Sequence, residues 1–476
     1  MKKERIAIID NGINGKILNN NKMLTEIVID ENKNCKKEHM EIHLTDFQHG
    51  TICALILEKY YPDCILSSIQ ILDKKGKGEI EKIEPAFEWC YQNGVTLINL
   101  SLGTTNFSDC EKLNKMINKY ANKGLIIVAA TSNTGFLTYP ASFSNVIGVA
   151  TTGSPIQYCN HYIHLGIDAV ASSEHTIKMY DTDLTTQLSN SYATPFVCAL
   201  VARKISMDGI RDIHALKSYV STQTHLDIIG DLYDPDWVYK AYMLNGRNKS
   251  KANYYFEVVY GNGEEIEGEI DTIITYSLAE LEQIRLKNKN LIYLGEDDII
   301  NVQTTGFKWS QNTRVQQILN NKHHGGDLCI PIIFLDIEDF MDEYFIMSEL
   351  KRLFKEDGYN AYAIATEAES ILYRLEYIPD VSLPNQTIKD FIEGQVYYKQ
   401  SDLILWSVAK EKKRRMYELY PDYDMEILFK NNMENTEVSF YIEKRLFRKE
   451  EYWDMEEHIK EIYAIIVHYL TEADHE

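Results

Sequence analysis

The chain has 476 residues, of which 45% are hydrophobic and 25% are charged. This composition is typical of globular proteins, and the length is too great for a single hydrophobic core. The formal net charge of −22 argues against nucleic acid as a partner, because an acidic surface repels phosphates. The sequence also lacks the run of about eighteen apolar residues that a membrane span requires.

The charge is unevenly distributed along the chain. Residues 1–245 carry 23 Lys and Arg against 27 Asp and Glu, a balance of −4, and the rest carries 26 against 44, a balance of −18. The basic run at residues 410–415 is interpreted as a solvated helix face. Eight scattered cysteines without a CxxC pair predict reduced thiols. The first apolar run, at residues 6–9, is too short for a secretory signal, which predicts a cytoplasmic protein.

The first half alternates strand and helix signals. Continuous apolar runs predict buried strands, and apolar residues at helical spacing, closed by glycines, predict helices between them. This alternation predicts an α/β fold whose parallel sheet is covered by helices on both faces. The expected strands are residues 5–10, 64–72, 95–103, 125–130 and 144–153, and the expected helices are 49–61, 79–94, 109–124 and the segment from 191 onward.

Three residues lie where such a fold places its chemistry, at strand ends and helix starts. Asp10 ends the first strand, His49 begins a helix and Ser191 begins another. A serine becomes a nucleophile when an imidazole takes its proton and a carboxylate orients that imidazole. Taken singly, Asp10 also reads as a turn residue, and His49 and Ser191 as helix caps. Their joint occurrence favours catalysis.

Five motifs follow one another along the first half: IAIIDNGIN, HGTICALI, INLSLGT, VAATSNTG and SNSYATPFVCAL. Their order and context resemble those of the subtilisin-like serine proteases, the subtilases. The segment at residues 61–103 also follows the strand, glycine-rich loop, helix and strand progression of that family. The resemblance covers residues 4–225 and implies a subtilisin-like domain.

The resemblance implies a role for each matching position. Ser191 would be the nucleophile, His49 the general base and then acid, and Asp10 the orienting carboxylate. Asn133 would direct its side-chain amide into the oxyanion hole beside the N–H of Ser191, although without the family it reads as a loop residue. The positions implied to pair with an extended substrate and to shape its specificity pocket, with the last as the floor, are Ser101, Leu102, Gly103, Ala130, Ser132 and Thr138.

The chain also departs from the family. Ser189 and Asn190 stand where the family usually has Gly and Thr, a difference that bears on the turn before the nucleophile and on a secondary oxyanion contact. Ile52 replaces a second histidine, which we expect to alter packing alone. No segment matches the family's asparagine-rich calcium loop, so neither a metal nor a cofactor is predicted. The few residues before Asp10 leave no room for a folding propeptide, so narrow recognition or a partner is expected to restrain the activity.

The second half reads as a smaller α/β domain at residues 254–476, after a first domain at 1–245 and a linker at 245–253. The loop from Asp336 to Asp342 follows a strand but lacks the glycine and lysine of a phosphate cradle, and its carboxylates would repel a triphosphate. This half resembles the degenerate NTPase-like domains of accessory proteins in bacterial peptide natural-product maturation, which implies a degenerate P-loop-like domain suited to binding. The expected strands are 254–261, 271–278, 289–295, the apolar run before residue 336, the one after Gly358, 402–408 and 425–429.

These observations predict a cytoplasmic serine endopeptidase that cleaves a peptide or protein precursor. Removal of a leader from a ribosomally made peptide is one such reaction, with the acidic half, or a partner in a maturation complex, helping to select the substrate. The alternative is a binding or scaffold protein in which the turn at Ser189 and Asn190 has cost the fold its activity. The sequence determines neither the substrate nor the oligomeric state.

Overall fold

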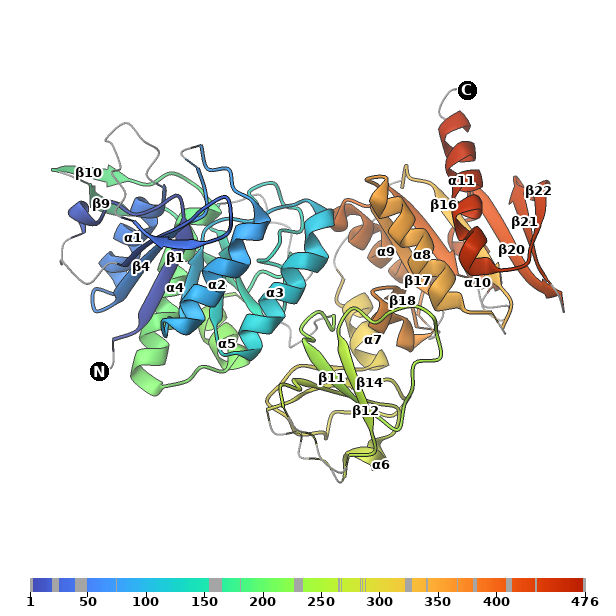
Figure 1. Cartoon of the computed structure of the whole chain (residues 1–476), viewed down its shortest axis with the longest axis horizontal. Coiled ribbons are helices and arrows are strands. Elements are labelled where there is room, and N and C mark those ends of the chain that lie inside the picture. The colour runs from blue at the N-terminus through green and yellow to red at the C-terminus, as the bar shows by residue number, and fades with distance from the viewer. Residues whose placement is uncertain are drawn as a thin grey trace. The chain divides into compact units, whose positions relative to one another are not determined.

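The structure of the chain, a computed structural model, is shown in Figure 1. The chain forms two compact units: unit 1 comprises Met1–Tyr239, Lys287–Lys289 and Thr304–Phe307, and unit 2 comprises the remainder. Within the described residues, no helix combines the length and apolarity needed to cross a bilayer. The structure describes residues 3–18, 25–38, 49–73, 75–153, 165–179, 181–226, 234–263, 266, 268–282, 284, 286, 288–321, 328–339, 341–365, 367–379, 383–407, 413–432 and 435–473.

Unit 1 is built on an eight-stranded sheet. Its strands are β1 (Arg5–Asp10), β2 (Thr25–Ile29), β3 (Cys35–Lys37), β4 (Ile65–Gln70), β5 (Leu97–Leu100), β6 (Ile126–Ala130), β7 (Val146–Thr151) and β8 (Ala169–Ala171). They lie in the order β3-β2-β4-β1-β5-β6-β7-β8, and all neighbours are parallel except β2 and β3. Strands β5, β6 and β7 are almost wholly apolar and fully buried, because both faces of the sheet are covered there.

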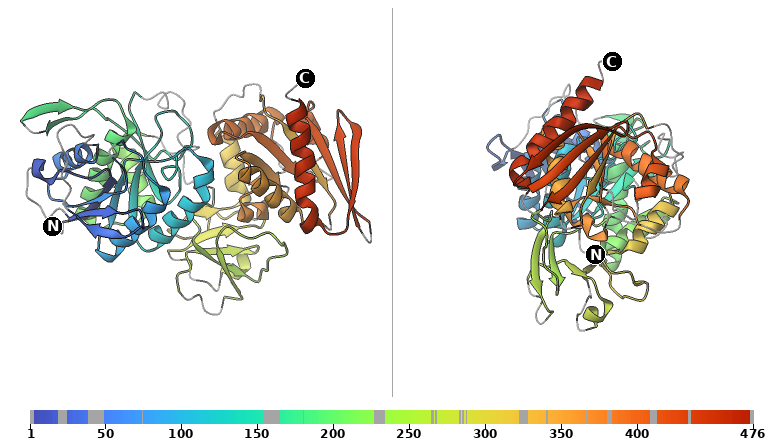
Figure 2. Two further views of the ribbon diagram at one scale, coloured as in Figure 1. Left: turned by 45° about the horizontal axis from the view of Figure 1, so that its top comes forward. Right: turned by 90° about the vertical axis from the view of Figure 1, so that its right-hand side faces the viewer.

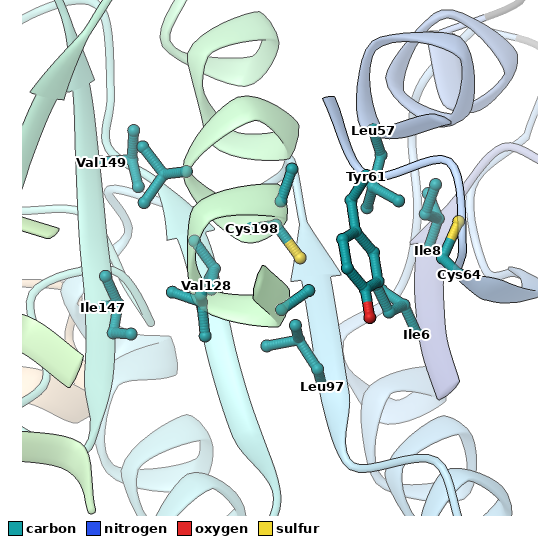
Figure 3. Packing of buried hydrophobic residues seen from close by; sticks show 14 of the residues in the cluster. Ile6, Ile8, Leu57, Tyr61, Cys64, Leu97, Val128, Ile147, Val149 and Cys198 are labelled. Atoms are coloured by element: carbon teal, nitrogen blue, oxygen red, sulfur yellow. The ribbon is translucent and has the colours of Figure 1, made fainter. Parts of the chain in front are cut away.

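Helices cover the two faces of this sheet. They are α1 (His49–Tyr60), α2 (Ile83–Gln92), α3 (Cys110–Asn122), α4 (Asn190–Asp208) and α5 (Ile213–Gln223), with short 3-10 turns at Gly15–Ile17, Ile80–Lys82 and Phe107–Asp109. Ile6 and Ile8 of β1 pack with α1, α4 and α5, whereas Ala7 and Ile9 pack with α2 and α3. Figure 3 shows the first of these layers, in which Cys198 of α4 lies against the strands.

The secondary structure predicted for the first half is confirmed. Gly94 and Gly124, which were expected to end α2 and α3, have φ values of 67° and 91°. Glycine adopts this left-handed conformation without a Cβ clash, and each residue turns the chain directly into the next strand. The carboxyl ends of the parallel strands therefore gather at one edge, where Asp10 ends β1 and Ser101 follows β5.

A hairpin that the sequence did not indicate precedes α4. Its strands β9 (Thr176–Met179) and β10 (Thr182–Thr185) pair antiparallel, and Figures 1 and 2 show it projecting from unit 1. Thr186 closes its base, because the Thr186 hydroxyl accepts from the N–H of His175 over 2.8 Å and donates to the carbonyl of Ser173 over 2.6 Å. This base positions the chain that enters α4.

Unit 2 contains a five-stranded parallel sheet in its first part. The strands are β11 (Lys240–Leu244), β12 (Glu257–Gly261), β13 (Thr272–Thr275), β14 (Asn290–Tyr293) and β15 (Lys308–Trp309), and the helices are α6 (Leu278–Leu281) and α7 (Gln311–Leu319). The strand order is β12-β11-β13-β14-β15. Every neighbouring pair is parallel.

The second part of unit 2 is a seven-stranded mixed sheet with helices. Its strands are β16 (Ile332–Ile337), β17 (Ala361–Ala365), β18 (Glu376–Tyr377), β19 (Leu403–Ser407), β20 (Met425–Asn432), β21 (Asn435–Ile442) and β22 (Arg445–Tyr452). Its helices are α8 (Glu343–Glu356), α9 (Asn385–Lys399), α10 (Lys413–Leu419) and α11 (Met455–Ala473), with a 3-10 turn at Ala368–Tyr373. The order is β18-β17-β19-β16-β20-β21-β22. The pairs β20–β21 and β21–β22 are antiparallel, and the other neighbouring pairs are parallel.

Unit 2 begins earlier than the sequence indicates. Residues 240–244, assigned from the sequence to the first domain, form β11 and pair with β12 and β13. The segment interpreted as a linker is also bound within unit 2. Ser250 Oγ donates to Asp342 Oδ1 over 2.7 Å, and the N–H of Lys251 donates to Asp342 Oδ2 over 2.6 Å. The polar residues of this segment thus hydrogen-bond to Asp342, at the start of α8, and do not form a free linker.

Carboxylates of the acidic loop after β16 hold the loop in place. Asp342 caps α8 by accepting the N–H of Phe345 over 3.1 Å. Glu338 accepts the N–H of Asn431 over 2.8 Å. These two carboxylates act as local acceptors, which agrees with the interpretation that the loop does not cradle phosphate.

The basic run at residues 410–415 is only partly a solvated helix face, and residues 410–412 lie outside the described part of the chain. Lys413 begins α10 and pairs with Asp336 over 2.8 Å and with Glu426 over 3.0 Å. The side chain of Arg414, in contrast, is 92% exposed. The charge pattern alone does not predict that Lys413 pairs with carboxylates of β16 and β20, which are far from it in the sequence.

Candidate active site

Asp10 and His49 form a hydrogen bond at the carboxyl end of β1. His49 Nδ1 lies 2.8 Å from Asp10 Oδ2, and the two residues are 9% and 1% exposed. Asp10 Oδ1 accepts the N–H of Asn11, also over 2.8 Å. Because an ionised carboxylate can only accept, Nδ1 carries the proton of the neutral ring and Nε2 keeps its lone pair.

Asn11 joins the end of β1 to the start of α1. Its Oδ1 accepts the N–H of Gly50 over 3.0 Å, one of the amides that the first turn of a helix leaves without a helical partner. Gly50 permits this approach because a Cβ at that position would lie 2.5 Å from the carbonyl oxygen of Gly12. The contact holds His49, the first residue of α1, beside Asp10.

The surroundings of His49 shift its pKa in two directions. Burial alone would lower the pKa of the imidazole, because it disfavours the charged form. The charge of Asp10 and the hydrogen bond to it outweigh burial, so the pKa of His49 lies above its ordinary value. Such a group accepts a proton readily and is stabilised once it is charged.

Ser191 lies in the first turn of α4, where its carbonyl is held from outside the helix. In a regular helix this carbonyl would accept the N–H of residue 195, but Pro195 has none. Ser101 Oγ donates to it instead over 2.9 Å, and Cys53 Sγ lies 3.7 Å away. Asn99 Nδ2 in turn donates to Ser101 Oγ over 2.9 Å. The backbone of Ser191 is therefore attached to the end of β5 and to α1.

His49 and Ser191 belong to neighbouring helices. The ring of His49 packs on the ring of Tyr192, with centroids 5.3 Å apart. Cys53, one turn after His49 in α1, contacts the carbonyl of Ser191. These contacts bring the imidazole to the first turn of α4, as the interpretation of the two residues requires.

The hydroxyl of Ser191 meets a second hydroxyl. Ser191 Oγ and Ser189 Oγ are 2.8 Å apart. Ser189 is the N-cap residue of α4, yet its side chain caps no amide of the helix. The N–H of Ser191 has no acceptor among the residues that the structure describes. It is thus available to a ligand at the positive end of the helix.

Asn190 points away from the site and locks the turn that precedes α4. It is fully buried. Its Nδ2 donates to the carbonyls of Thr131 and Ser132 over 3.0 and 2.9 Å, and its Oδ1 accepts the N–H of Thr151 over 2.8 Å. Asn190 therefore binds the ends of β6 and β7 together.

Asn133 is oriented by the turn at Asn190. Its Oδ1 accepts the N–H of Asn190 over 3.0 Å. Because a backbone N–H needs an acceptor, the atom of the Asn133 amide that faces Asn190 is the oxygen, Oδ1. The opposite end, Nδ2, is left as a donor near the N-terminus of α4. An exposed amide and a free N–H at this helix start are the two donors that an oxyanion needs.

The structure brings some of the implied pocket residues together. A Cβ on Gly103 would lie 2.8 Å from Thr138 Cγ2 and 3.6 Å from the carbonyl oxygen of Ala130. Thr138 is buried, and its Oγ1 accepts the N–H of Ser132 over 2.7 Å. Leu102 packs its side chain on the core beneath α2 and α3. The binding role of these residues stays a prediction.

Comparison with known proteins addresses the first half of the chain. Residues 1–226 match the model of the Subtilase family. We refer to residues 1–226 as the N-terminal region. Its match extends over nearly the same residues as the resemblance seen in the motifs, and it includes Asp10, His49, Asn133 and Ser191.

Individual relatives match a shorter stretch. The chain is 30% identical over 145 residues to Subtilisin BL of Lederbergia lenta, covering 30% of this chain and 53% of the relative. It is 30% identical over 145 residues to the Thermostable alkaline protease of Halalkalibacterium halodurans, covering 40% of that protein. It is 28% identical over 153 residues to the Minor extracellular protease Epr of Bacillus subtilis, covering 22% of that protein. The matched stretch thus spans between a fifth and a half of these relatives.

One group in the described part of the N-terminal region has donors that could hold a metal ion. Ligand atoms of Asp10, His49 and Cys53 lie within 4.8 Å of one another. Burial raises the pKa of the Cys53 thiol well above its ordinary value, which disfavours the thiolate that metals bind. Asp10 Oδ2 and His49 Nδ1 are already joined by a hydrogen bond. This donor set fits a proton relay better than a metal site.

Several residues that shape the candidate site could not be predicted from the sequence. The sequence singles out neither Asn11 nor Cys53. Asn190 and Ser189 were noted as departures without a function. The spacing of Pro195 four residues after Ser191 is the one signal in the sequence that could have indicated an outside donor to the carbonyl of Ser191.

Proposed function

We propose that the chain is a serine endopeptidase in which Asp10, His49 and Ser191 form the catalytic triad. The observation that carries this proposal is the hydrogen bond of 2.8 Å between His49 Nδ1 and Asp10 Oδ2, beside the first turn of α4. The match of residues 1–226 to the Subtilase family supports it. The alternative is a binding protein that has lost activity at the turn of Ser189 and Asn190. It gains no support from this turn, in which both side chains are hydrogen-bonded.

The reaction follows from the roles of these groups. Ser191 Oγ attacks the scissile carbonyl carbon while its proton passes to His49 Nε2, and Asp10 stabilises the imidazolium. The oxyanion is met by the N–H of Ser191 and by Asn133 Nδ2. The intermediate collapses, the C–N bond breaks, and His49 returns the proton to the leaving amine. Water then attacks the acyl-enzyme by the same route and frees Ser191.

The substrate we propose is a peptide or protein precursor with a basic segment. Residues 246–476 carry 26 basic against 44 acidic residues, a balance of −18, which attracts positive charge from a distance. Unit 2 is then a recruiting unit, and removal of a leader from a ribosomally made peptide is the reaction we favour. A partner in a maturation complex would bind the same acidic surface.

The location we propose is the cytoplasm. Cysteines of the described residues, among them Cys53, Cys90 and Cys198, are free thiols. Free, buried thiols are typical of reducing compartments. Cys35 and Cys329 are exposed, and Cys159 lies outside the described residues.

Two measurements test the proposal. The first is labelling with a fluorophosphonate probe, which reacts with activated serines whatever the substrate. Wild-type protein should be labelled and Ser191→Ala should not. A folded wild type that resists the probe would favour the binding-protein alternative.

The second measurement concerns recruitment. Cleavage of a precursor with a basic segment should weaken as salt rises from about 0.1 M to about 1 M, since the Debye length falls from about 10 Å to about 3 Å. A short neutral peptide with the same cleavage site is the control and should be cleaved at a rate that salt barely changes. Equal salt dependence for both substrates would exclude charge-based recruitment.

A further inference from the structure

The hydroxyl of Ser189 is placed by a well-anchored backbone. Ser189 has an extended conformation, with φ −162° and ψ 137°. Its N–H donates to Ser173 Oγ over 3.2 Å, and its carbonyl accepts the N–H of Tyr192 over 3.1 Å. Ser173 Oγ also accepts from Thr151 Oγ1 over 2.8 Å. The position of Ser189 is thus fixed on both sides of its Cα.

A serine at this position would ordinarily cap the helix. Its hydroxyl would accept an N–H of the second or third helical residue, here Ser191 or Tyr192. In this chain the side chain of Ser189 makes no such bond and lies 2.8 Å from Ser191 Oγ. The hydroxyl pair therefore leaves the N–H of Ser191 open, whereas an ordinary cap would compete with an oxyanion for it.

We propose that Ser189 is a positioning residue for the nucleophile, whose hydroxyl donates a hydrogen bond to Ser191 Oγ. This inference rests on the proposed function. With Asp10 holding the proton of His49 on Nδ1, the lone pair of Nε2 is the acceptor for the proton of Ser191. The lone pairs of Ser191 Oγ then accept from Ser189, which fixes the rotamer of Ser191 with its own proton directed to His49.

The arrangement depends on a hydroxyl that the resembled family usually lacks, because a glycine stands there in its pattern. Glycine could neither donate to Ser191 nor resist rotation of the turn. Asn190 takes no part in the contact, since its side chain is buried on the other side of the turn. Ser189 thus orients the nucleophile, and Asn190 makes the loop rigid.

The test uses an isosteric pair in the full-length protein. Ser189→Thr keeps the hydroxyl and Ser189→Val replaces it with a methyl of similar size, and the extended backbone at this position suits both β-branched side chains. The readouts are kinact and KI for a fluorophosphonate probe, whose P–F bond breaks as Ser191 Oγ bonds to phosphorus, fluoride leaves and the serine proton passes to His49. Melting temperatures show whether the variants fold.

We expect kinact of Ser189→Val to fall about three- to tenfold, with KI unchanged and Ser189→Thr within about twofold of wild type. A merely structural role would lower the two variants alike. Equal kinact for Ser189→Val and Ser189→Thr would overturn the proposal. A faster Ser189→Val would overturn it too, because Ser189 would then be restraining the nucleophile. A folded wild type that the probe does not label would refute the proposed function itself, a result distinct from both.

Discussion

Pro195 stands four residues after Ser191 in α4 and so denies the carbonyl of Ser191 its helical donor. Ser101 supplies that donor from the end of β5 over 2.9 Å. Because Pro195 has no N–H, the carbonyl of Ser191 accepts from Ser101, and this hydrogen bond links the start of α4 to the edge of the sheet. Because Ser191 moves with its own carbonyl, this bond sets the position of the candidate nucleophile relative to the strand ends.

Ser101→Ala removes the donor and leaves the part-buried carbonyl of Ser191 with the weaker Cys53 thiol as a donor. We expect a loss of about 1–3 kcal/mol in the free energy of unfolding and a slower reaction with the probe. Urea unfolding and labelling kinetics measure the two effects. Thr105→Ala, at an exposed position two residues beyond the pocket segment, is the control and should change neither. A Ser101→Ala protein as stable and as reactive as the control would show that the carbonyl needs no outside donor.

Asn133 offers a matched pair of variants. Asn133→Asp keeps an oxygen that can accept the N–H of Asn190 but loses the amide donor, and Asn133→Ala loses both. If Asn133 meets the oxyanion, both variants should lower turnover by roughly 10²–10³ or more with little change in KM, since the contact exists only in the transition state. Only Asn133→Ala should also lower the melting temperature. Full turnover by Asn133→Asp would assign the residue to loop structure alone.

The pKa of His49 predicts the pH dependence. Neutral His49 is the base, so the labelling rate should rise with pH, and the midpoint should lie above the ordinary histidine value of 6.5 because Asp10 raises the pKa. The raised pKa of His49 also makes stability depend on pH, but stability falls as pH rises, whereas the labelling rate increases. The Asp10–His49 pair contributes its full stability below pH 6.5 and loses it as pH rises through the raised pKa.

Asp10→Ala removes the group that raises this pKa and leaves burial, which lowers it. The midpoint of the labelling profile should move below that of wild type, and the rate at its plateau should fall because the imidazole loses its orientation. Labelling rates measured across pH 5 to 9, in steps of about half a unit, give both quantities. A midpoint that stays in place after the substitution would show that Asp10 does not set the pKa of His49.

Local patterns predicted the elements that carry the site. β1, α1 and α4 follow from apolar periodicity, and the turns at Gly94 and Gly124 follow from the left-handed φ that glycine tolerates. Asp10, His49 and Ser191 could be singled out because each stands at the end of such an element. The family pattern, rather than periodicity, drew attention to Asn133.

Long-range contacts account for what the sequence did not predict. Asn190 reads as a polar turn residue, yet it is buried because three backbone groups from β6 and β7 satisfy its amide. Lys413 reads as part of a solvated run but meets Asp336 across the second sheet of unit 2. The short strands β9 and β10 lack a strong apolar alternation and form because their base is tied at Thr186.

The most direct test of the central claim is to identify the residue that a fluorophosphonate probe modifies in the full-length protein. The account predicts a single adduct on Ser191, found by mass spectrometry of the digested protein, with no adduct in Ser191→Ala and a reaction slowed in Asp10→Ala. Ser191 is the predicted target because it lies in the first turn of α4, where the ring of the next residue, Tyr192, packs on His49. Its N–H has no acceptor among the described residues. A folded wild type without an adduct, or with its adduct on another serine that persists in Ser191→Ala, would contradict the account.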